Sequence, residues 1–378
     1  MRIGILTQAL RNNYGGLLQN YALQTVLRNW GNDVCTLDWD WVDRHPYKTY
    51  FRSILNIILR NNHHKPYVLT PAEDAIIHQH VYHFRNTFIS CTDKFKTDRE
   101  FTSYERNNIP NAYIVGSDQC WRPKYNPFQG KMFLDFVPKR DVKRIAYAAS
   151  FGTDSWEFTD SRYFKLIQAF DLVTVRESTG VNLCREHFGI KAHHVLDPTM
   201  LLDREDYIKL IKAEDDGLPS QGNLFYYILD PNLKIKEFID YAGQKYGMTP
   251  FMVLPKYKEE YRTKKHVKNC INECIYPSPV RWIKGIMDAK LAIVDSFHGM
   301  VFSIIFNKPF WVIGNTSRGM RRFSSLLGQL DLENRILDIN GTSRPDLLEP
   351  IDWQRINGIL AQKKEQSLEL LSYALKNG

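Results

Sequence analysis

The stretch LAIVDSFHGMVFSIIF, residues 291–306, carries the clearest fold signal in this chain of 378 residues. Its first four residues are apolar and predict a buried strand, which stops at the polar group DSFHG. The apolar residues that follow predict a helix, and PFWVI at 309–313 predicts the next strand. A strand, a short loop and a helix form the repeating unit of parallel α/β sheets. This unit would place His298 in the loop at the carboxyl end of a strand.

The same alternation runs through the rest of the chain. Short apolar segments predict strands at 2–8, 34–37, 113–115, 144–149, 172–175 and 194–196, and then at 224–229, 251–254, 291–294 and 309–313. A turn-rich connector, with EDDG at 214–217 and PSQG at 219–222, separates the two sets. We predict an α/β protein of two Rossmann-like domains, residues 1–200 and 223–345, that face each other across a cleft. Residues 346–378 predict a helical segment that packs back on the N-terminal domain.

The composition narrows the class of protein and of partner. With 43% hydrophobic and 24% charged residues, the chain is not a mainly disordered protein. It has no run of about 18 uncharged apolar residues and no signal-peptide pattern at its start, so we expect a cytoplasmic protein. A net charge of +8 favours anionic partners, but the basic residues are dispersed, which argues against nucleic acid. The six cysteines lack a zinc-ligand spacing, which predicts free thiols and no metal site.

Polar residues follow several predicted strands, where open parallel sheets bind their ligands. In the N-terminal half these strand ends are RNNYGG at 11–16, GSDQ at 116–119, SFG at 150–152, RES at 176–178 and DP at 197–198. We expect them to share one rim, with these candidate ligand contacts: Asn13, Tyr14, Gly15, Gly16, Gln19, Ser117, Gln119 and Ser150. The alternatives are a tight turn for the glycine loop, a helix cap for Asp118 and a turn-fixing role for Asp197.

His298 is the strongest candidate for chemistry. It begins a predicted helix, where unpaired backbone N–H groups and a partial positive charge attract an anion. Because the ordinary pKa of histidine is about 6.5, the ring can give a proton to such a ligand or accept one from a hydroxyl. Ser296, Phe297 and Gly299 are candidate contacts for the same ligand. The alternative is a histidine that only caps the helix, although Ser, Thr, Asp or Asn would cap better.

An anionic ligand needs fixed cations, and arginine pairs with carboxylates and phosphates through its planar fork. Arg176 stands at a predicted strand end, where the alternative role is a salt bridge. Arg318, Arg321 and Arg322 would share one helix face, and one of them is a candidate second cation. A solvated basic face or a contact to an acceptor phosphate is the alternative there. Lys308, just before a predicted strand, is a further candidate, or a plain loop lysine.

Six segments together resemble the polysaccharide pyruvyl transferase family. They are YGGLLQNYALQ at 14–24, VGSDQCW at 115–121, YAASFG at 147–152, VRES at 175–178, LDP at 196–198 and VDSFHGMVFSIIFNKPFWVI at 294–313. The likeness runs in the family's order over nearly the whole chain. It implies a fold similar to that of GT-B glycosyltransferases. It also implies an enzyme that transfers pyruvate from phosphoenolpyruvate to a sugar, as a ketal across two hydroxyls.

Together with the residues above, the resemblance assigns roles. His298, Arg176 and Asp118 would be catalytic, with His298 as general acid or base. Phosphoenolpyruvate, a co-substrate that needs no cofactor or metal, would bind the C-terminal domain at Ser296, Phe297, Gly299, Arg318, Arg322 and Lys308. The acceptor would bind the N-terminal domain at Asn13, Tyr14, Gly15, Gly16, Gln19, Ser117, Gln119 and Ser150. Some members carry an arginine two residues before the histidine, where this chain has Ser296, so one anion contact stays unassigned.

The implied acceptor is a saccharide destined for a cell-surface polymer, with a lipid diphosphate as a candidate carrier. A basic protein with such an acceptor would contact the anionic inner face of the membrane peripherally. Two other functions stay open on the same fold, because fold does not fix function. One is a GT-B glycosyltransferase that uses a nucleotide sugar, and the other is a non-catalytic saccharide-binding protein.

Overall fold

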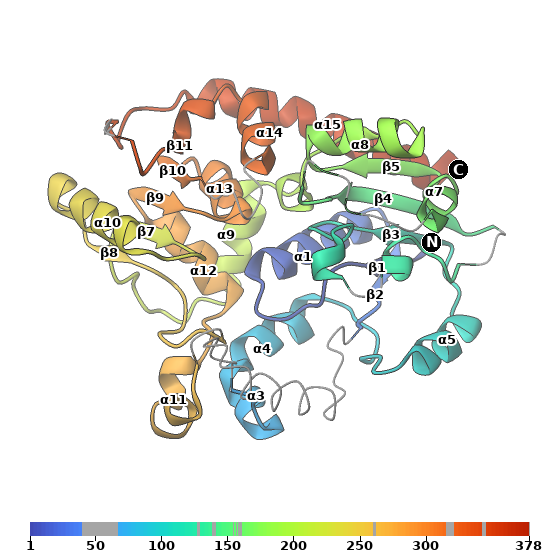
Figure 1. Ribbon diagram of the computed structural model, residues 1–378, viewed down its shortest axis with the longest axis horizontal. Coiled ribbons are helices and arrows are strands. Elements are labelled where there is room, and N and C mark those ends of the chain that lie inside the picture. The colour runs from blue at the N-terminus through green and yellow to red at the C-terminus, as the bar shows by residue number, and fades with distance from the viewer. Residues whose placement is uncertain are drawn as a thin grey trace, which may run out of the picture.

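Figure 1 shows two sheets side by side, with helices packed around each of them. This computed structural model describes residues 1–39, 67–126, 129–137, 141–153, 155, 157, 161–259, 262–314, 321–341 and 345–377. Both sheets consist of parallel strands joined through helices. The chain therefore has the two-domain α/β fold that its sequence predicts.

The first sheet consists of six strands: β1 (Arg2–Leu6), β2 (Asp33–Thr36), β3 (Ala112–Val115), β4 (Lys143–Ala149), β5 (Leu172–Val175) and β6 (His193–His194). They lie in the order β2-β1-β3-β4-β5-β6 and are all parallel. Strand β3, at the centre of the sheet, is apolar throughout (AYIV), because helices cover both faces of the sheet. Ile5 of β1 lies opposite Ile114 of β3, which sets the register at the centre of the sheet.

The helices of this half are α1 (Tyr14–Asn29), α3 (Pro71–Ile77), α4 (Gln79–Phe88), α5 (Asp98–Asn107), α6 (Gln129–Met132), α7 (Arg162–Ile167), α8 (Ser178–Phe188) and α9 (Arg204–Ala213), with short 3-10 turns η1 (Pro123–Tyr125) and η2 (Pro198–Leu201). Helix α1 matters most for the site. It begins where Asn13 Oδ1 accepts a hydrogen bond from Gly16 N (3.1 Å), and it buries Leu17, Leu18 and Leu23 in the core. This cap fixes the loop after β1.

The second sheet consists of five parallel strands: β7 (Leu224–Tyr227), β8 (Pro250–Phe251), β9 (Leu291–Val294), β10 (Phe310–Ile313) and β11 (Ile336–Leu337). Their order is β11-β10-β9-β7-β8. The helices and 3-10 turns around them are α10 (Leu233–Tyr246), α11 (Lys264–Asn269), η4 (Ile271–Cys274), α12 (Pro279–Asp288), α13 (Phe297–Ile305), α14 (Arg321–Gln329) and η6 (Glu333–Arg335). Leu291, Ile293, Trp311 and Ile313 of β9 and β10 are buried and join the core of this half.

Both sheets repeat one topology, because the first strand of each lies between the second and the third. The chain reverses its direction of travel between β1 and β3, and again between β7 and β9. Ligands of open α/β sheets bind at such switch points, outside the carboxyl ends of the strands. The loops that follow β1, β3, β7 and β9 are therefore the places to look for a site.

The last helix, α15 (Trp353–Asn377), returns to the first half of the molecule (Figure 1). Lys143 Nζ of β4 donates hydrogen bonds to the carbonyl oxygens of Ala374 (3.2 Å) and Leu375 (2.6 Å). The backbone N–H of Leu196 donates to Ser367 Oγ (3.1 Å) on the same helix. The chain thus passes between the two halves twice.

The structure departs from the predicted elements in a few places. Strands β6 and β8 are two residues each, shorter than the segments 194–196 and 251–254, and β11 was not expected. Beyond β6, the Leu196 N–H turns to α15 and Asp197 caps η2, so the strand ends early. The sequence also predicts a polar helical region at 50–110, and its first part, as far as residue 66, lies outside the described residues. Among the described helices, none has the length and apolar character needed to span a bilayer.

Candidate active site

His298 lies in the first turn of α13, at the carboxyl end of β9. The helix begins here because Ser296 Oγ accepts a hydrogen bond from Gly299 N (2.9 Å). Ser296 is therefore the cap, and the His298 ring is left for another role. The preceding carboxylate, Asp295, accepts a hydrogen bond from Asp230 N (3.0 Å), which ties the end of β9 to the loop after β7. The second switch point holds the loop of His298 in place.

The imidazole of His298 reaches across to the first sheet. A Cβ atom at Gly15 of α1 would overlap the His298 ring, so this position requires a glycine. On the other side, His298 Nε2 lies 3.5 Å from Asp197 Oδ2, just after β6. The residue is 8% exposed, and Nε2 has no hydrogen-bond partner among the described residues. A histidine of one domain is thus enclosed by residues of the other.

Asp197 is the centre of the polar network beside His298. Its Oδ2 accepts hydrogen bonds from Arg176 Nη1 (2.9 Å) and Ser117 Oγ (3.0 Å), and its Oδ1 accepts from Thr199 N (3.0 Å) and Thr199 Oγ1 (2.7 Å). Burial raises the pKa of this carboxyl, but His298, Arg176 and Thr199 outweigh burial and hold the pKa far below its usual range. Asp197 is a fixed negative charge that faces the imidazole. Asp197 also caps η2 through Thr199 N, which confirms the turn-fixing role expected from the sequence.

Asp118 provides a second carboxylate, at the end of β3. Its Oδ2 accepts a hydrogen bond from Asn13 Nδ2 (2.9 Å), and its Oδ1 lies 3.4 Å from Arg176 Nη2. Burial raises the pKa of Asp118, but Arg176, His298 and Arg322 outweigh burial, so the pKa is lowered. This carboxylate therefore stays ionised between the loop after β1 and the Arg176 guanidinium.

Arg176, directly after β5, joins the two carboxylates to the second domain. Its side chain is buried and pairs with both Asp197 and Asp118. The guanidinium also lies over the ring of Phe297 on α13, 4.4 Å from the ring centroid. Such a desolvated cation–π contact is worth about 2 kcal/mol. Arg176 therefore helps to hold α13, and with it His298, against the first sheet.

Two more buried charges belong to the same rim. Arg322, at the start of α14, is 8% exposed, and burial together with Arg176 lowers its pKa to about 10. Glu177 Oε1 accepts a hydrogen bond from Ser150 Oγ (3.0 Å), while Glu177 Oε2 has no hydrogen-bond partner within the described residues. Burial raises the pKa of Glu177, although Arg176 and Arg322 oppose the shift. Arginines gathered in this way favour a bound anion between them.

Some predicted ligand contacts are engaged within the protein. Gln19 is fully buried, where its Nε2 donates to Thr7 Oγ1 (2.9 Å) and its Oε1 accepts from Ser117 N (3.1 Å). The hydroxyl of Tyr14 donates to the carbonyl oxygen of Pro277 (2.8 Å) in the second domain. Both side chains brace the loops of the rim. Other predicted contacts keep some exposure, namely Asn13, Gln119 and Ser296.

Lys308 does not belong to this group, which corrects the expectation from the sequence. It precedes β10 and therefore lies at the amino end of the parallel sheet, whereas His298 follows β9 at the carboxyl end. Burial and the nearby Arg204 lower the pKa of Lys308. The charged group closest to Lys308 is therefore not one of the groups around His298. Arg318 lies outside the described residues.

No ligand or catalytic role for Asp197 or Asp295 followed from the sequence. Each of them stands at the carboxyl end of a strand, and that shared position was a usable signal. The contact between Asp197 and His298 depends on how the two sheets meet, which the strand pattern does not contain. The full arrangement places a proton-transferring ring among ionised carboxylates and buried guanidinium groups. Such a site suits the transfer of an anionic group to a hydroxyl.

Comparison with solved structures supports the fold. Arabidopsis thaliana UGT89C1 complexed with UDP-L-rhamnose is 9% identical, with 99% of this chain and 98% of that chain covered and a TM-score of 0.52. S. aureus MnaA with UDP is 12% identical, with 98% of this chain and 90% of that chain covered and a TM-score of 0.51. The UDP-GlcNAc 2-epimerase of Methanocaldococcus jannaschii is 13% identical, with 99% of this chain and 100% of that chain covered and a TM-score of 0.49. The likeness to UGT89C1 and MnaA shows a GT-B type fold.

The family of the chain follows from its sequence. No curated protein matches it closely enough to count as a relative. The pattern that defines polysaccharide pyruvyl transferases, however, matches residues 13–317. This range begins at Asn13, which caps α1, and it contains Asp118, Arg176, Asp197 and His298. Arg322 lies beyond the matched range. Because the match spans most of the chain, this protein belongs to the polysaccharide pyruvyl transferase family.

Proposed function

We propose that the protein transfers the pyruvyl group of phosphoenolpyruvate to a saccharide and forms a cyclic ketal. The observation that carries the proposal is the position of His298 between Gly15 and Asp197, with Arg176 and Arg322 at the same rim. A donor with both a carboxylate and a phosphate requires cations and a proton-transferring group close together. The rim combines these groups.

In this proposal Arg322 provides the anion contact that Ser296 leaves open. Arg322, at the start of α14, is near enough to Asp118 and Glu177 to lower the pKa of both carboxyls, so it lies at the same rim. Burial and Arg176 disfavour the charge of Arg322, and an anion beside it would stabilise that charge. Arg176 is already paired with two carboxylates, so we assign it the positioning of the site and a lesser share of donor binding.

The reaction needs a proton at the methylene carbon of phosphoenolpyruvate, which makes the adjacent carbon an oxocarbenium centre. One sugar hydroxyl bonds to that carbon and loses its proton. Inorganic phosphate then leaves with the electrons of its C–O bond, and a second hydroxyl adds and loses its proton to close the ketal. We assign the proton transfers to His298, with Asp197 holding the imidazolium form through its negative charge. One proton ends on carbon, and the other is released with phosphate.

The saccharide acceptor would approach from the first domain. The side chain of Asn13 is exposed and that of Gln119 is partly exposed at the rim, and amides of this kind bind sugar hydroxyls. Asp118 would orient the attacking hydroxyl. A saccharide on a lipid diphosphate would fit the net charge of +8, because a basic protein is attracted to an anionic membrane surface.

A glycosyl transfer from a nucleotide sugar is the second candidate. The observation in its favour is the likeness of the fold to UGT89C1, which was solved with UDP-L-rhamnose. Family membership favours the pyruvyl reaction.

A thermal-shift experiment separates the two donors. Phosphoenolpyruvate and UDP-sugars are added in turn to the wild-type protein, and a ligand at a hundred-fold excess over its Kd raises stability by about 2.7 kcal/mol. Stabilisation by phosphoenolpyruvate alone supports the proposal, and stabilisation by a UDP-sugar alone contradicts it.

Phosphate release with a panel of diol-bearing saccharides then tests the role of His298. We expect His298→Ala to lower kcat by about 10²–10⁴-fold. The matched control is His80→Ala, which removes an exposed histidine of α4 and should match the wild type. A loss of less than about ten-fold in His298→Ala would remove His298 from the mechanism.

A further inference from the structure

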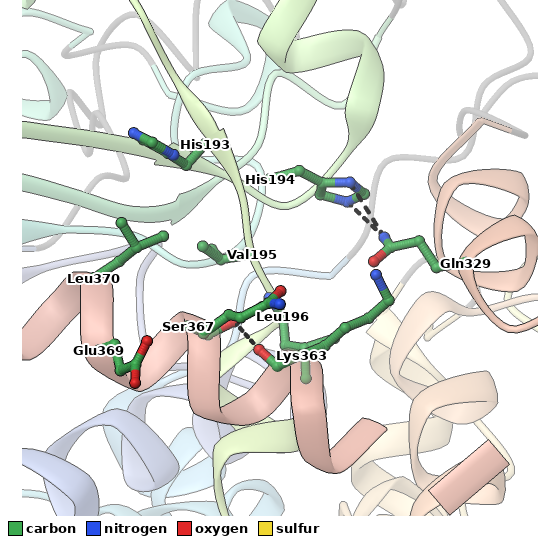
Figure 2. A pocket seen from close by; sticks show the side chains of 10 residues that line it. His193, His194, Val195, Leu196, Gln329, Lys363, Ser367, Glu369 and Leu370 are labelled. Carbon is green, nitrogen blue, oxygen red and sulfur yellow. Dashed lines mark hydrogen bonds between the residues drawn. The ribbon is translucent and has the colours of Figure 1, made fainter. Parts of the chain in front are cut away.

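A hollow of about 360 Å³ lies between β6, α14 and α15, and no residue of the proposed mechanism lines it (Figure 2). It is bounded mainly by polar side chains from three elements that are far apart in the sequence. Its lining includes His194, Leu196, Gln329, Lys363, Ser367 and Glu369.

The wall of the hollow formed by β6 offers a backbone donor. β6 is the edge strand of the first sheet, so one of its sides has no neighbouring strand. Val195 N donates to Val175 O on β5, and alternation therefore turns the N–H groups of His194 and Leu196 away from β5. Leu196 N donates to Ser367 Oγ on α15 (3.1 Å), and the His194 N–H lies on the same side of the strand. The His194 N–H is thus a donor directed at the hollow.

Lys363 brings a positive charge to the same place. Its side chain is half-buried, and it has no acidic partner within the described residues, whereas Lys364 is bonded to Asp203 Oδ1 (2.7 Å). Figure 2 shows Lys363 extending towards Gln329 and His194, with Glu369 at the other end of the hollow. Burial lowers the pKa of His194, and Lys363 is close enough to lower it further. The hydrogen bond to the Arg176 carbonyl has the opposite effect and raises this pKa.

His194 connects the hollow to the rim of the candidate active site. Its Nε2 lies 3.0 Å from the carbonyl oxygen of Arg176, which can only accept, so Nε2 carries the proton of this contact. Gln329 Nε2 can then donate to His194 Nδ1 (3.2 Å). A molecule bound against His194 would act on the backbone of Arg176, whose side chain holds Asp118 and Asp197.

We propose that this hollow is a second anion site, which takes a small molecule bearing a carboxylate or phosphate group. Lys363 Nζ supplies the charge and the His194 backbone N–H supplies a directed donor, so anionic oxygens satisfy both at once. Glu369, at the opposite end, leaves the end formed by His194 and Lys363 positive. The site is separate from donor binding and does not rest on the reaction proposed above. Its occupant would reach the reaction only through His194 and the backbone of Arg176.

Titration with simple anions tests the site. The full-length protein, with isotope-labelled histidine, is titrated separately with inorganic phosphate and with acetate while the imidazole signals of His194 are followed by NMR. We expect a saturable movement of the His194 signals with at least one of the two, and the stronger binder identifies the group that the site prefers.

Two neighbouring lysines provide the variant and its control. Lys363→Met removes the charge in the hollow, and Lys364→Met removes a lysine that is bonded to Asp203 instead. We expect Lys363→Met to lower the affinity for the anion by at least about ten-fold and Lys364→Met to leave this affinity unchanged. An equal response in Lys363→Met and the wild type would overturn the proposal, because the anion would then be acting from the cleft through Arg176. An absence of any saturable His194 response in the wild type would overturn it as well.

Discussion

The two sheets repeat one strand order, but they contribute to the candidate active site in different ways. The rim of the first sheet carries buried charges that are bonded to one another, with Arg176 between Asp118 and Asp197. The rim of the second sheet is closed by backbone caps from Asp295 and Ser296, and it extends His298 into the first domain. The first domain therefore supplies fixed charge, and the second supplies the His298 ring, to which we assign the proton transfers. Neither rim is a complete site alone.

This difference predicts which changes destabilise the fold and which affect only the reaction. A buried charge that loses its partner is costly, since the remaining charge has neither water nor a counter-ion. The Nε2 atom of His298 has no hydrogen-bond partner within the described residues, so loss of this ring should affect the reaction more than the fold. The predictions below test that division, from the largest expected effect to the smallest.

The largest effect should come from Arg176→Met, which leaves Asp118 and Asp197 buried without their cation. We expect the free energy of unfolding to fall by about 3–5 kcal/mol at pH 7, measured by urea titration. The exposed Arg185, changed to Met, is the control and should change it by less than about 0.5 kcal/mol.

The pH dependence of the same variant sharpens the test. In the wild type the lowered pKa values of Asp118 and Asp197 give stability that is present at neutral pH and is lost as pH falls through those values. In Arg176→Met the unpaired carboxyls gain protons more readily, so the deficit should shrink between pH 7 and pH 4. A deficit that stays constant over this range would mean that the two carboxylates do not depend on Arg176.

Gly15→Ala should be next, and it acts on the contact between the domains. The new Cβ would overlap the His298 ring, so the ring or the helix must move. A displacement of about 1 Å at a reacting group can lower the rate about 10²-fold, and we expect a loss of kcat of this order. Gly358→Ala in α15 is the matched control, because a Cβ there meets no atom and should stabilise the helix by about 0.5–1 kcal/mol. Full activity in Gly15→Ala would show that His298 need not lie against α1.

A third comparison concerns the carboxyl and amino ends of the strands in the second sheet. If Arg322 binds the donor, Arg322→Met should lower the affinity for phosphoenolpyruvate by at least about ten-fold in calorimetric titration. Lys308→Met, at the amino edge, should change the affinity by less than about two-fold. A larger effect at Lys308 than at Arg322 would reverse our placement of the donor.

The smallest effect should be that of Glu177→Gln on stability. A carboxyl whose pKa is raised on folding stabilises the native state at low pH and loses that stabilisation as pH rises from its ordinary value towards the raised one. Glutamine has no charge to bury, so the variant should gain stability relative to the wild type between pH 4 and pH 7. Thermal unfolding at both pH values measures the difference. A relative loss over the same interval would show that Glu177 is ionised and needed as an anion.

The sequence predicted the two-domain α/β fold because the strand-and-helix alternation is local, as at residues 291–313. It also placed His298, Arg176 and Asp118 at strand ends, and the carboxyl-end rule is what brings them to one rim. The amino-end position of Lys308 was equally readable from its place before a strand. The inward turn of Gln19 and Tyr14 was not, because periodicity does not say whether a polar side chain finds its partner in the protein or in a ligand.

The position of Asp197 after a strand was readable from the sequence, but its contact with His298 was not. In the chain it follows a two-residue edge strand and begins a 3-10 turn, as an ordinary turn residue would. Its importance comes from His298, about a hundred positions away and in the other domain. Contacts of this kind depend on how two independently built sheets meet, and no local pattern encodes that meeting.

The return of α15 to the first sheet has a mechanical consequence. Two bodies joined by a single tether can swivel in any direction, whereas two bodies joined at two separate points can swing only about the line between those points. This chain crosses once ahead of β7 and again between β11 and α15. Any opening of the molecule is therefore restricted to one arc. After each opening, the same arc would carry the His298 ring back to Asp197 in the same alignment.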